Sequence, residues 1–116
     1  MKRLEVRSLQ DRDVGSITAA FRTLGWDKPR SQYERYLSEQ RLGGRAVFVA
    51  FSDGGAFAGY VTVRWSSGYP PIREAGVPEF QDFNVLPRFR RKGIESSLMD
   101  EAELAVSEWS SVVGIG

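Results

Sequence analysis

Two β-rich runs separated by a short turn signal occupy the centre of this chain of 116 residues. The runs are RAVFVAF, residues 45–51, and AFAGYVTVRW, residues 56–65, with SDGG between them. β-branched and aromatic residues favour strands, and a short linker with Asp and Gly favours a tight turn. The sequence therefore predicts an antiparallel hairpin, which already requires a fold that contains a sheet.

Extended and helical patterns precede this hairpin. Residues 3–9 have the alternation of a short strand, and apolar residues at helical spacing then lead to Gly25, a residue that commonly ends helices. Residues 31–40 predict a second helix, and a pair of glycines follows it. A strand and two helices are therefore expected before the hairpin.

A second set of elements follows the hairpin. Residues 66–76 contain turn residues and two prolines, which predicts a loop long enough to act as a substrate lid. Residues 78–86 predict a fourth strand, a helix begins near Ile94, and Ser111 to Gly116 predict a fifth strand. A strand, a crossover helix and a strand would place strands four and five parallel. The whole chain, residues 1–116, is expected to form one α/β (α+β) domain.

Composition excludes several kinds of function. The chain has neither cysteine nor histidine, so disulfides, serine or cysteine triads with a histidine base, and a zinc site are not expected. A formal charge of only +1 gives little support for nucleic-acid binding. No apolar run is long enough to span a bilayer, and the first residues lack a signal-peptide core. A cytoplasmic protein without metal is the expectation.

The loop before the last predicted helix is basic. Arg88, Arg90, Arg91 and Lys92 precede Gly93. The first N–H groups of a helix have no partner within the helix and attract anions, and a glycine lets a ligand approach the backbone. These features predict a phosphate-binding loop, although a solvated basic loop would give the same local pattern. Neither a Walker loop nor a dinucleotide fingerprint is present.

The stretch FNVLPRFRRKGIESSLMDEAE resembles motif A of the GNAT superfamily of N-acetyltransferases, R/Q-x-x-G-x-G/A. Arg90 matches the first position and Gly93 the first glycine, whereas Glu95 stands where a second glycine or alanine is expected. The order of the other elements agrees with the family. The resemblance implies a GNAT-like acyl-CoA N-acyltransferase fold, with a mixed, mostly antiparallel sheet and helices on both faces, truncated after the fifth strand.

The resemblance also implies a site for acetyl-CoA. The end of the fourth strand would pair with the pantetheine arm, and the amide near Val85 would polarise the thioester carbonyl. The loop and the first helical turn would hold the pyrophosphate. The residues implied for cofactor binding are Asn84, Val85, Leu86, Arg90, Arg91, Lys92, Gly93, Ile94, Glu95 and Ser96.

The implied reaction is direct attack of an amine on the thioester, with a base that removes the ammonium proton. The acceptor would be a small-molecule or peptide amine. Glu79 and Asp82 on the fourth strand are the candidate catalytic bases, and regular alternation would place them on opposite faces of the sheet. Trp26, Tyr33 and Tyr69 are candidates for lining an acceptor pocket, with core packing as the alternative.

Two departures from the family pattern lead to further expectations. Glu95 favours the helix but opposes a bound phosphate, unless it pairs with Arg91 or Lys92. The chain also ends before the family's next helix, which carries a tyrosine acid, and before two more strands. We therefore expect a homodimer that covers the open sheet edge. The alternative to an active enzyme is a truncated GNAT domain that folds and self-associates but binds CoA weakly. A small nucleic-acid binder that uses Arg88 to Lys92 ranks last.

Overall fold

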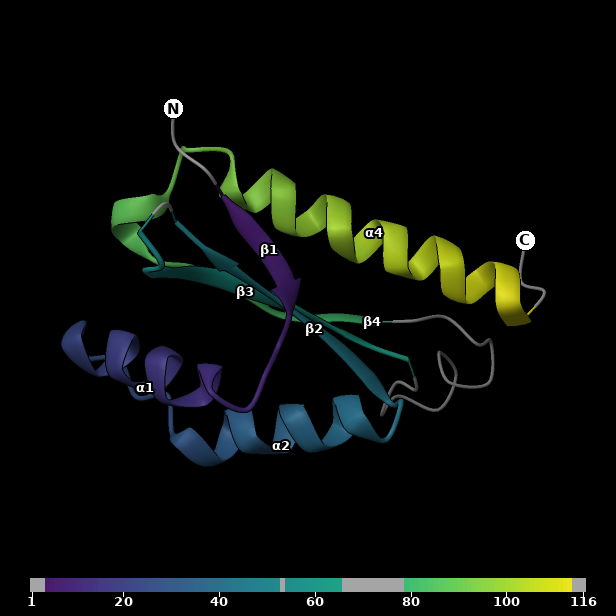
Figure 1. Cartoon of the computed structure of the whole chain (residues 1–116), viewed down its shortest axis with the longest axis horizontal. Coiled ribbons are helices and arrows are strands. Elements are labelled where there is room, and N and C mark those ends of the chain that lie inside the picture. The colour runs from purple at the N-terminus through teal and green to yellow at the C-terminus, as the bar shows by residue number, and fades with distance from the viewer. Residues whose placement is uncertain (1–3, 53, 66–78, 114–116) are drawn as a thin grey trace.

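The computed structural model describes residues 4–52, 54–65 and 79–113, with side chains described as far as residue 108. Its elements follow one another as a strand, two helices, three strands, a short 3-10 helix and a long helix (Figure 1). The predicted lid at residues 66–76, which includes Tyr69, lies outside the described residues. Within them, the order of elements agrees with the sequence as far as the last helix.

The described strands form one sheet in chain order. β1 (Glu5–Ser8), β2 (Arg45–Phe51), β3 (Phe57–Arg64) and β4 (Glu79–Val85) are neighbours in that sequence, and every pair is antiparallel. The predicted hairpin is confirmed as β2 and β3. β4 is therefore an edge strand of the described sheet, and its outer side faces away from β3.

Helices cover both faces of the sheet. α1 (Asp13–Thr23) and α2 (Arg30–Arg41) lie on one face, and α4 (Ile94–Val113) lies on the other (Figure 1). This arrangement confirms the layered fold with helices on both faces. The core lies between these layers, and its largest fully buried hydrophobic side chains are those of Tyr33, Tyr60, Phe21, Ile17, Leu98, Val14, Val47, Val49, Val61 and Val63.

The prediction of a strand that starts at Ser111 is wrong. α4 continues through Ser111 to Val113, and residues 114–116 lie outside the described part. β-branched valines lower helix propensity by only about 0.5 kcal/mol each, so two of them do not end an established helix. The described residues therefore contain no fifth strand that could pair in parallel with β4.

β4 contains a bulge that changes which way its side chains point. Thr62 of β3 pairs with Gln81 and Tyr60 pairs with Asn84, so two residues of β4 lie opposite the single residue between them on β3. Asp82, one of the two, has a φ of 55°. A bulge of this kind interrupts the regular alternation of a strand.

The expectation that Glu79 and Asp82 face opposite sides of the sheet is therefore wrong. Glu79 pairs with Arg64, which lies on the same face of β3 as Tyr60, and the Tyr60 hydroxyl contacts the Asp82 carboxylate. Both carboxylates lie on the side of the sheet that α1 and α2 cover. The extra residue in the bulge supplies the physical reason, because it reverses the alternation between them.

Candidate functional site

The Asp82 carboxylate is the centre of a polar cluster under the bulge. Its Oδ2 atom accepts hydrogen bonds from the hydroxyl of Tyr36 at 2.7 Å, the hydroxyl of Tyr60 at 2.7 Å and Nε2 of Gln32 at 2.8 Å. The donors come from α2 and β3, so one carboxylate joins three elements. We call Asp82 and these three donors, together with Asn84, the Asp82 cluster.

The two oxygens of this carboxylate have different surroundings. Oδ1 accepts one hydrogen bond, from Nδ2 of Asn84 at 2.8 Å, and the Nζ atom of Lys28 lies 3.9 Å from it. The Asp82 side chain keeps 19% of its surface exposed, and that of Lys28 keeps 26%. Oδ1 is thus the less occupied oxygen, and the nearest charged group to it is a primary amine.

Buried tyrosine hydroxyls keep their protons in this cluster. Burial is the largest cause that raises the pKa of Tyr36 to about 12, and the hydrogen bond to Asp82 adds to it. Burial also raises the pKa of Tyr33 to about 12, and it raises the pKa of Tyr60 further. At neutral pH these hydroxyls are therefore protonated. Those of Tyr36 and Tyr60 donate to Asp82. The hydroxyl oxygen of Tyr33 lies 3.2 Å from the hydroxyl oxygen of Tyr60.

A buried arginine fixes α2 against the sheet beside this cluster. Arg45 donates to Glu39 at 2.7 Å, to the Thr62 hydroxyl at 2.7 Å and to the Gln81 side chain at 3.2 Å. Its guanidinium also lies 4.4 Å from the centre of the Tyr36 ring. Gln81 immediately precedes Asp82. Arg45 therefore holds the residue before the bulge on the same face of the sheet as the Asp82 carboxylate.

The end of β4 presents backbone groups to its open side. Leu86 donates its N–H to the carbonyl of Ala58 at 2.8 Å, so the groups of Leu86 point toward β3. Successive strand residues point their backbone groups to opposite sides, so those of Val85 point away from β3. Nε of Arg90 donates to the Val85 carbonyl at 3.1 Å, which ties the following loop to this strand end.

The loop between β4 and α4 has open N–H groups. The first backbone hydrogen bond at the start of α4 runs from Ser97 N to Gly93 O, so the N–H groups of Ile94, Glu95 and Ser96 lack a helical acceptor. Arg91 and Gly93 both have positive φ, 63° and 81°. Left-handed residues of this kind occur in loops whose N–H groups converge on an anion.

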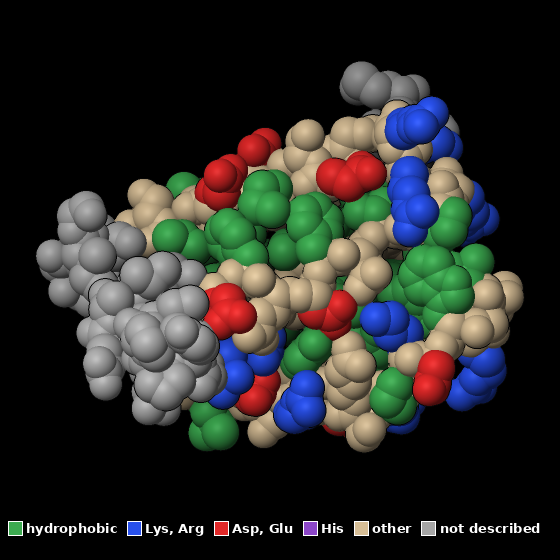
Figure 2. Space-filling model, turned by 180° about the vertical axis from the view of Figure 1, so that it is seen from behind, with side chains coloured by type: hydrophobic (Ala, Val, Ile, Leu, Met, Phe, Trp, Pro, Cys, Tyr) green, Lys and Arg blue, Asp and Glu red, His purple; other side chains and the backbone are tan. Residues whose placement is uncertain are grey.

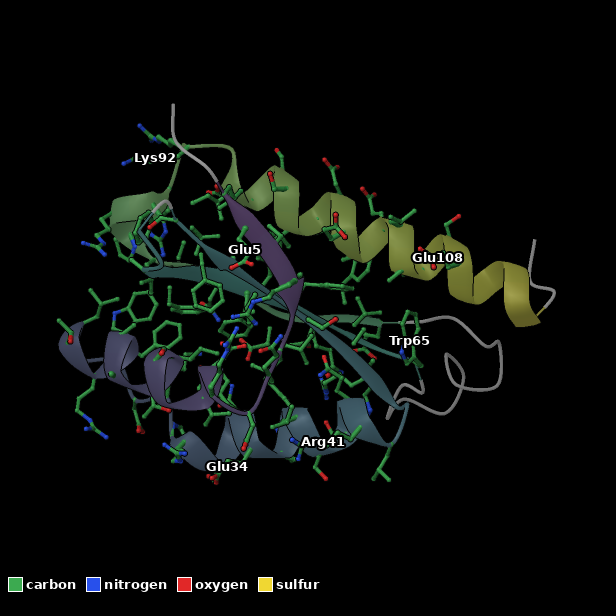
Figure 3. The ribbon with its side chains drawn as sticks, viewed as in Figure 1. Glu5, Glu34, Arg41, Trp65, Lys92 and Glu108 are labelled. Carbon is green, nitrogen blue, oxygen red and sulfur yellow. The ribbon has the colours of Figure 1, made fainter. Side chains whose placement is uncertain are left out.

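The same loop carries uncompensated positive charge. No ion pair joins Arg88, Arg90, Arg91 or Lys92 to an acidic side chain in the described ranges. Arg88 and Lys92 lie over the ring of Phe89, at 4.5 Å and 6.0 Å from its centre. Lys92 points away from the body of the molecule (Figure 3), and Lys and Arg side chains gather at this end (Figure 2). The loop therefore fits a polyanion.

Glu95 lies in the first turn of α4 and is half-buried. Of the residues that the structure describes, neither Arg91 nor Lys92 forms an ion pair with it. The pairing that would neutralise its charge is thus not formed. Glu95 places a carboxylate beside the open N–H groups of the loop.

Two surface grooves adjoin these features. One, of about 600 Å³, lies between α1 and the end of β4 and has a mostly apolar lining that includes Ala20, Phe57 and Leu86, with Arg88 beside them. The other, of about 360 Å³, lies along the connection between α1 and α2 and includes Trp26 and Lys28. Lys28 connects the smaller groove with the Asp82 cluster.

The remaining predicted site residues lie at separate positions in the fold. Glu79 is half-buried at the start of β4, three residues before Asp82. Tyr33 belongs to the core and contacts the cluster through Tyr60, and Trp26 stacks on Phe21 with ring centres 5.4 Å apart. Sequence reasoning missed Lys28, Gln32, Tyr36 and Tyr60. No local signal marks them, because they meet Asp82 only through the packing of α2 on the sheet.

The described residues offer neither a metal site nor a membrane-spanning helix. They contain no group of three or more acidic, histidine or cysteine side chains that could hold a metal ion. None of the helices they form is both long and apolar enough to cross a membrane.

Comparison with solved structures shows the fold. The chain is similar to an acetyltransferase of Trypanosoma brucei, with 20% identity, a TM-score of 0.64, and coverage of 95% of this chain and 76% of that one. It is similar to the aminoglycoside antibiotic 6'-N-acetyltransferase AAC(6')-Ih of Acinetobacter baumannii, with 18% identity, a TM-score of 0.68, and coverage of 93% and 74%. It is also similar to AAC(6')-Iy in complex with the bisubstrate analogue CoA-S-monomethyl-acetylneamine, with 17% identity, a TM-score of 0.67, and coverage of 97% and 74%.

A search of curated proteins found no match. The sequence model of the acetyltransferase (GNAT) family matches residues 13–111, which include α1, the hairpin, the Asp82 cluster and the basic loop. The chain belongs to the acetyltransferase (GNAT) family.

Proposed function

We propose that the chain is an N-acetyltransferase that transfers an acetyl group from acetyl-CoA to an amine by direct attack. One observation carries the proposal. The short segment from Asp82 to Lys92 has a carboxylate with an available oxygen at one end, and at the other end it has a basic loop without ion-pair partners. The carboxylate suits a proton acceptor, and the loop suits a pyrophosphate. Between them, the end of β4 offers backbone groups to a ligand.

In this proposal the loop binds the cofactor mainly through its backbone. The N–H groups around Arg91, Lys92, Gly93 and the first helical turn would hold the pyrophosphate, and the four cations would add charge attraction. Arg90 would keep the loop against the strand through its bond to the Val85 carbonyl. The backbone of Asn84, Val85 and Leu86 would align the pantetheine arm, with the Val85 N–H toward the thioester oxygen.

Asp82 and Glu79 are the proposed bases. Oδ1 of Asp82 has one firm hydrogen bond and lies beside an amine, whereas its Oδ2 has three donors, so a proton would be accepted at Oδ1. Glu79 lies on the same side of the sheet and would serve an acceptor bound nearer the start of β4. The acceptor would be a small-molecule or peptide amine, bound on the face that α1 and α2 cover.

The test is release of free CoA thiol from acetyl-CoA with a panel of small amines and amino-terminal peptides. We expect turnover with at least one class of amine. Asp82→Asn should lower kcat by about a hundredfold if Asp82 is the base, and Glu79→Gln should do so if Glu79 is. Full activity in both variants would contradict the assignment of either carboxylate as base.

A second candidate is a domain that folds and self-associates but binds CoA weakly. The position of Glu95 favours it, because this carboxylate lies unpaired beside the groups that would hold the phosphates. Calorimetric titration with acetyl-CoA distinguishes the two candidates. Weak binding together with no thiol release for any amine would support the second.

The proposal includes a homodimer. β4 is an edge strand of the described sheet and carries two exposed aromatic residues, Phe80 and Phe83, with 45% and 38% of their surface accessible. Figure 2 shows hydrophobic side chains exposed between α4 and this edge. Unpaired edges and apolar patches favour association with a second copy, which would cover β4 around Phe80 and Phe83 and leave its end at Val85 to the pantetheine arm. Size-exclusion chromatography with light scattering should give twice the mass of the chain, and a monomer at all concentrations would contradict this.

A further inference from the structure

Lys28 lies beside the Asp82 oxygen to which the proposed function assigns proton acceptance. It belongs to the connection between α1 and α2 and lines the groove of about 360 Å³. Its Nζ atom is 3.9 Å from Oδ1 of Asp82 and 6.0 Å from the centre of the Phe21 ring. A carboxylate and an aromatic face are the groups that recognise an ammonium ion. The side-chain amine of Lys28 thus occupies a position suited to an amine substrate.

We propose that Lys28 is itself an acetyl acceptor, so that the chain acetylates its own side chain at this position. The inference rests on the proposed acetyl-CoA-dependent function. Lysine is a primary amine, which is the class of nucleophile that the proposed reaction uses. The Nζ atom already lies within reach of the oxygen to which we assign proton acceptance.

The chemistry of the step is balanced without any further reactant. The ammonium gives a proton to Oδ1 of Asp82, and the neutral Nζ attacks the thioester carbonyl carbon. The N–C bond forms, the C–S bond breaks, and CoA leaves as a thiolate that takes a proton from solvent. Loss of the second Nζ proton to solvent gives a neutral amide. No atom is oxidised or reduced.

The other lysines provide an internal comparison. The chain contains three lysines, and Lys2 lies outside the described residues. Lys92 is exposed in the basic loop, and no carboxylate of the described part pairs with it. Lys28 has only 26% of its side chain exposed and has the Asp82 carboxylate beside it. Chemical labelling should therefore favour Lys92, whereas an enzymatic reaction should favour Lys28.

Acetylation would change the site. It removes the positive charge next to Oδ1 and replaces a flexible ammonium with a neutral amide at the groove. Oδ1 of Asp82 would then have lost its neighbouring cation. In the unmodified chain, the Lys28 amine and an external amine would compete for the same position beside Oδ1. Acetylation removes this competition, so the acetylated chain should differ from the unmodified chain in its KM for an external amine.

The experiment incubates the full chain with acetyl-CoA and no other amine, and measures acetylation of each lysine by peptide mass spectrometry. We expect Lys28 to exceed Lys92 by at least about tenfold. Acetic anhydride, used as the chemical reference, should give the opposite order. The rate at Lys28 should not change with protein concentration, since the reaction lies within one chain.

Variants sharpen the result. Asp82→Asn should slow acetylation of Lys28, whereas Asp100→Asn, at an exposed position on α4, should leave it unchanged. Equal labelling of Lys28 and Lys92, or the order given by acetic anhydride, would overturn the proposal. Thiol release with an external amine but no acetyl group on Lys28 would overturn this inference alone, whereas no thiol release under any condition would overturn the proposed function as well.

Discussion

The Asp82 cluster and the β4–α4 loop differ in how their polar groups are satisfied. In the cluster, the carboxylate oxygens and the tyrosine hydroxyls find partners on α2, β3 and β4. In the loop, four cations have no ion-pair partner among the described residues, and the first N–H groups of α4 are open. The fold therefore satisfies most polar groups of the first region, whereas those of the second stay open, and we propose that an anion completes it. Substitutions should then affect stability in the cluster and affinity in the loop.

The largest effect is expected where the two regions join. Gly59 of β3 lies against the end of β4, and a Cβ atom placed on it would be 2.6 Å from the carbonyl oxygen of Asn84 and 3.0 Å from Cα of Val85. Both contacts are with backbone, so the strands would have to separate. Gly59→Ala should lower the free energy of unfolding by about 3 kcal/mol and weaken both turnover and acetyl-CoA binding. Urea denaturation and calorimetric titration measure the two effects.

A second glycine supplies the control for that change. A Cβ atom on Gly15 of α1 would meet only the Arg30 guanidinium, at 3.8 Å, which is an ordinary contact. Gly15→Ala should therefore stabilise the chain by about 0.5–1 kcal/mol, as alanine does within helices. If both alanine variants changed stability by the same amount, the close approach of β3 and β4 would not explain why glycine is needed at position 59.

Asp82→Asn is expected to have the next largest effect on stability. The substitution replaces one carboxylate oxygen with an NH₂ group, which would face donors from Tyr36, Tyr60 or Asn84. Lost charge-assisted hydrogen bonds of this kind cost about 2 kcal/mol. Acetyl-CoA affinity should remain close to that of the unmodified chain, because the loop is not touched. Urea denaturation and titration on the same samples test this separation.

Asp100 is the matched control, since it is an exposed aspartate on α4. Asp100→Asn should change stability by less than about 0.5 kcal/mol. A loss of affinity in Asp82→Asn as large as its loss of stability would show that the two regions are coupled more tightly than their contacts indicate.

The loop was predictable from the sequence because its determinants are local. Arg90, Gly93 and the start of the helix lie within a few residues, and the structure confirms a left-handed Gly93 just before α4. Local backbone preferences and the open N–H groups of a helix start suffice for that prediction. The roles of these residues in binding stay a prediction.

The cluster was not predictable, for two physical reasons. Its members Gln32, Tyr60 and Asp82 are separated by 22 to 50 positions in the chain, so only tertiary packing brings them together. The bulge adds one residue to β4 and turns Asp82 to the side opposite to the one that regular alternation gives. A bulge has no strong sequence signal here, since neither Asp82 nor Phe83 is a glycine. The hairpin, by contrast, was predictable from its strand residues and its turn.

Alkaline pH should weaken the cluster specifically. The pKa of Tyr36 is raised to about 12 in the folded chain, mainly by burial, against about 10 in the unfolded chain. Between these values the unfolded state has lost the proton that the folded state keeps, so the free energy of unfolding falls as pH rises. The contribution is fully present below about pH 10.

Tyr36→Phe should remove about 1 kcal/mol per pH unit of that slope within this range. Urea denaturation of both proteins at about pH 9 and about pH 11 gives the comparison, and other titrating groups cancel because they are common to both. Identical slopes in the two proteins would mean that the Tyr36 proton is not held by the fold.

The smallest effect on stability, with the opposite effect on affinity, is expected at Glu95. Glycine in the first turn of α4 should cost up to about 1 kcal/mol of helix stability and lose the favourable interaction of a carboxylate with the helix dipole. A carboxylate about 4 Å from a phosphate opposes binding by up to about 4 kcal/mol, and solvent screening lowers this figure. Glu95→Gly should therefore bind acetyl-CoA about tenfold more tightly in calorimetric titration while unfolding at lower urea. Glu95→Gln separates the two causes, because it removes the charge and keeps a helix-forming side chain, so it should gain affinity with little loss of stability. If neither variant binds more tightly, Glu95 does not compete with the phosphates, and the loop takes its anion in another place.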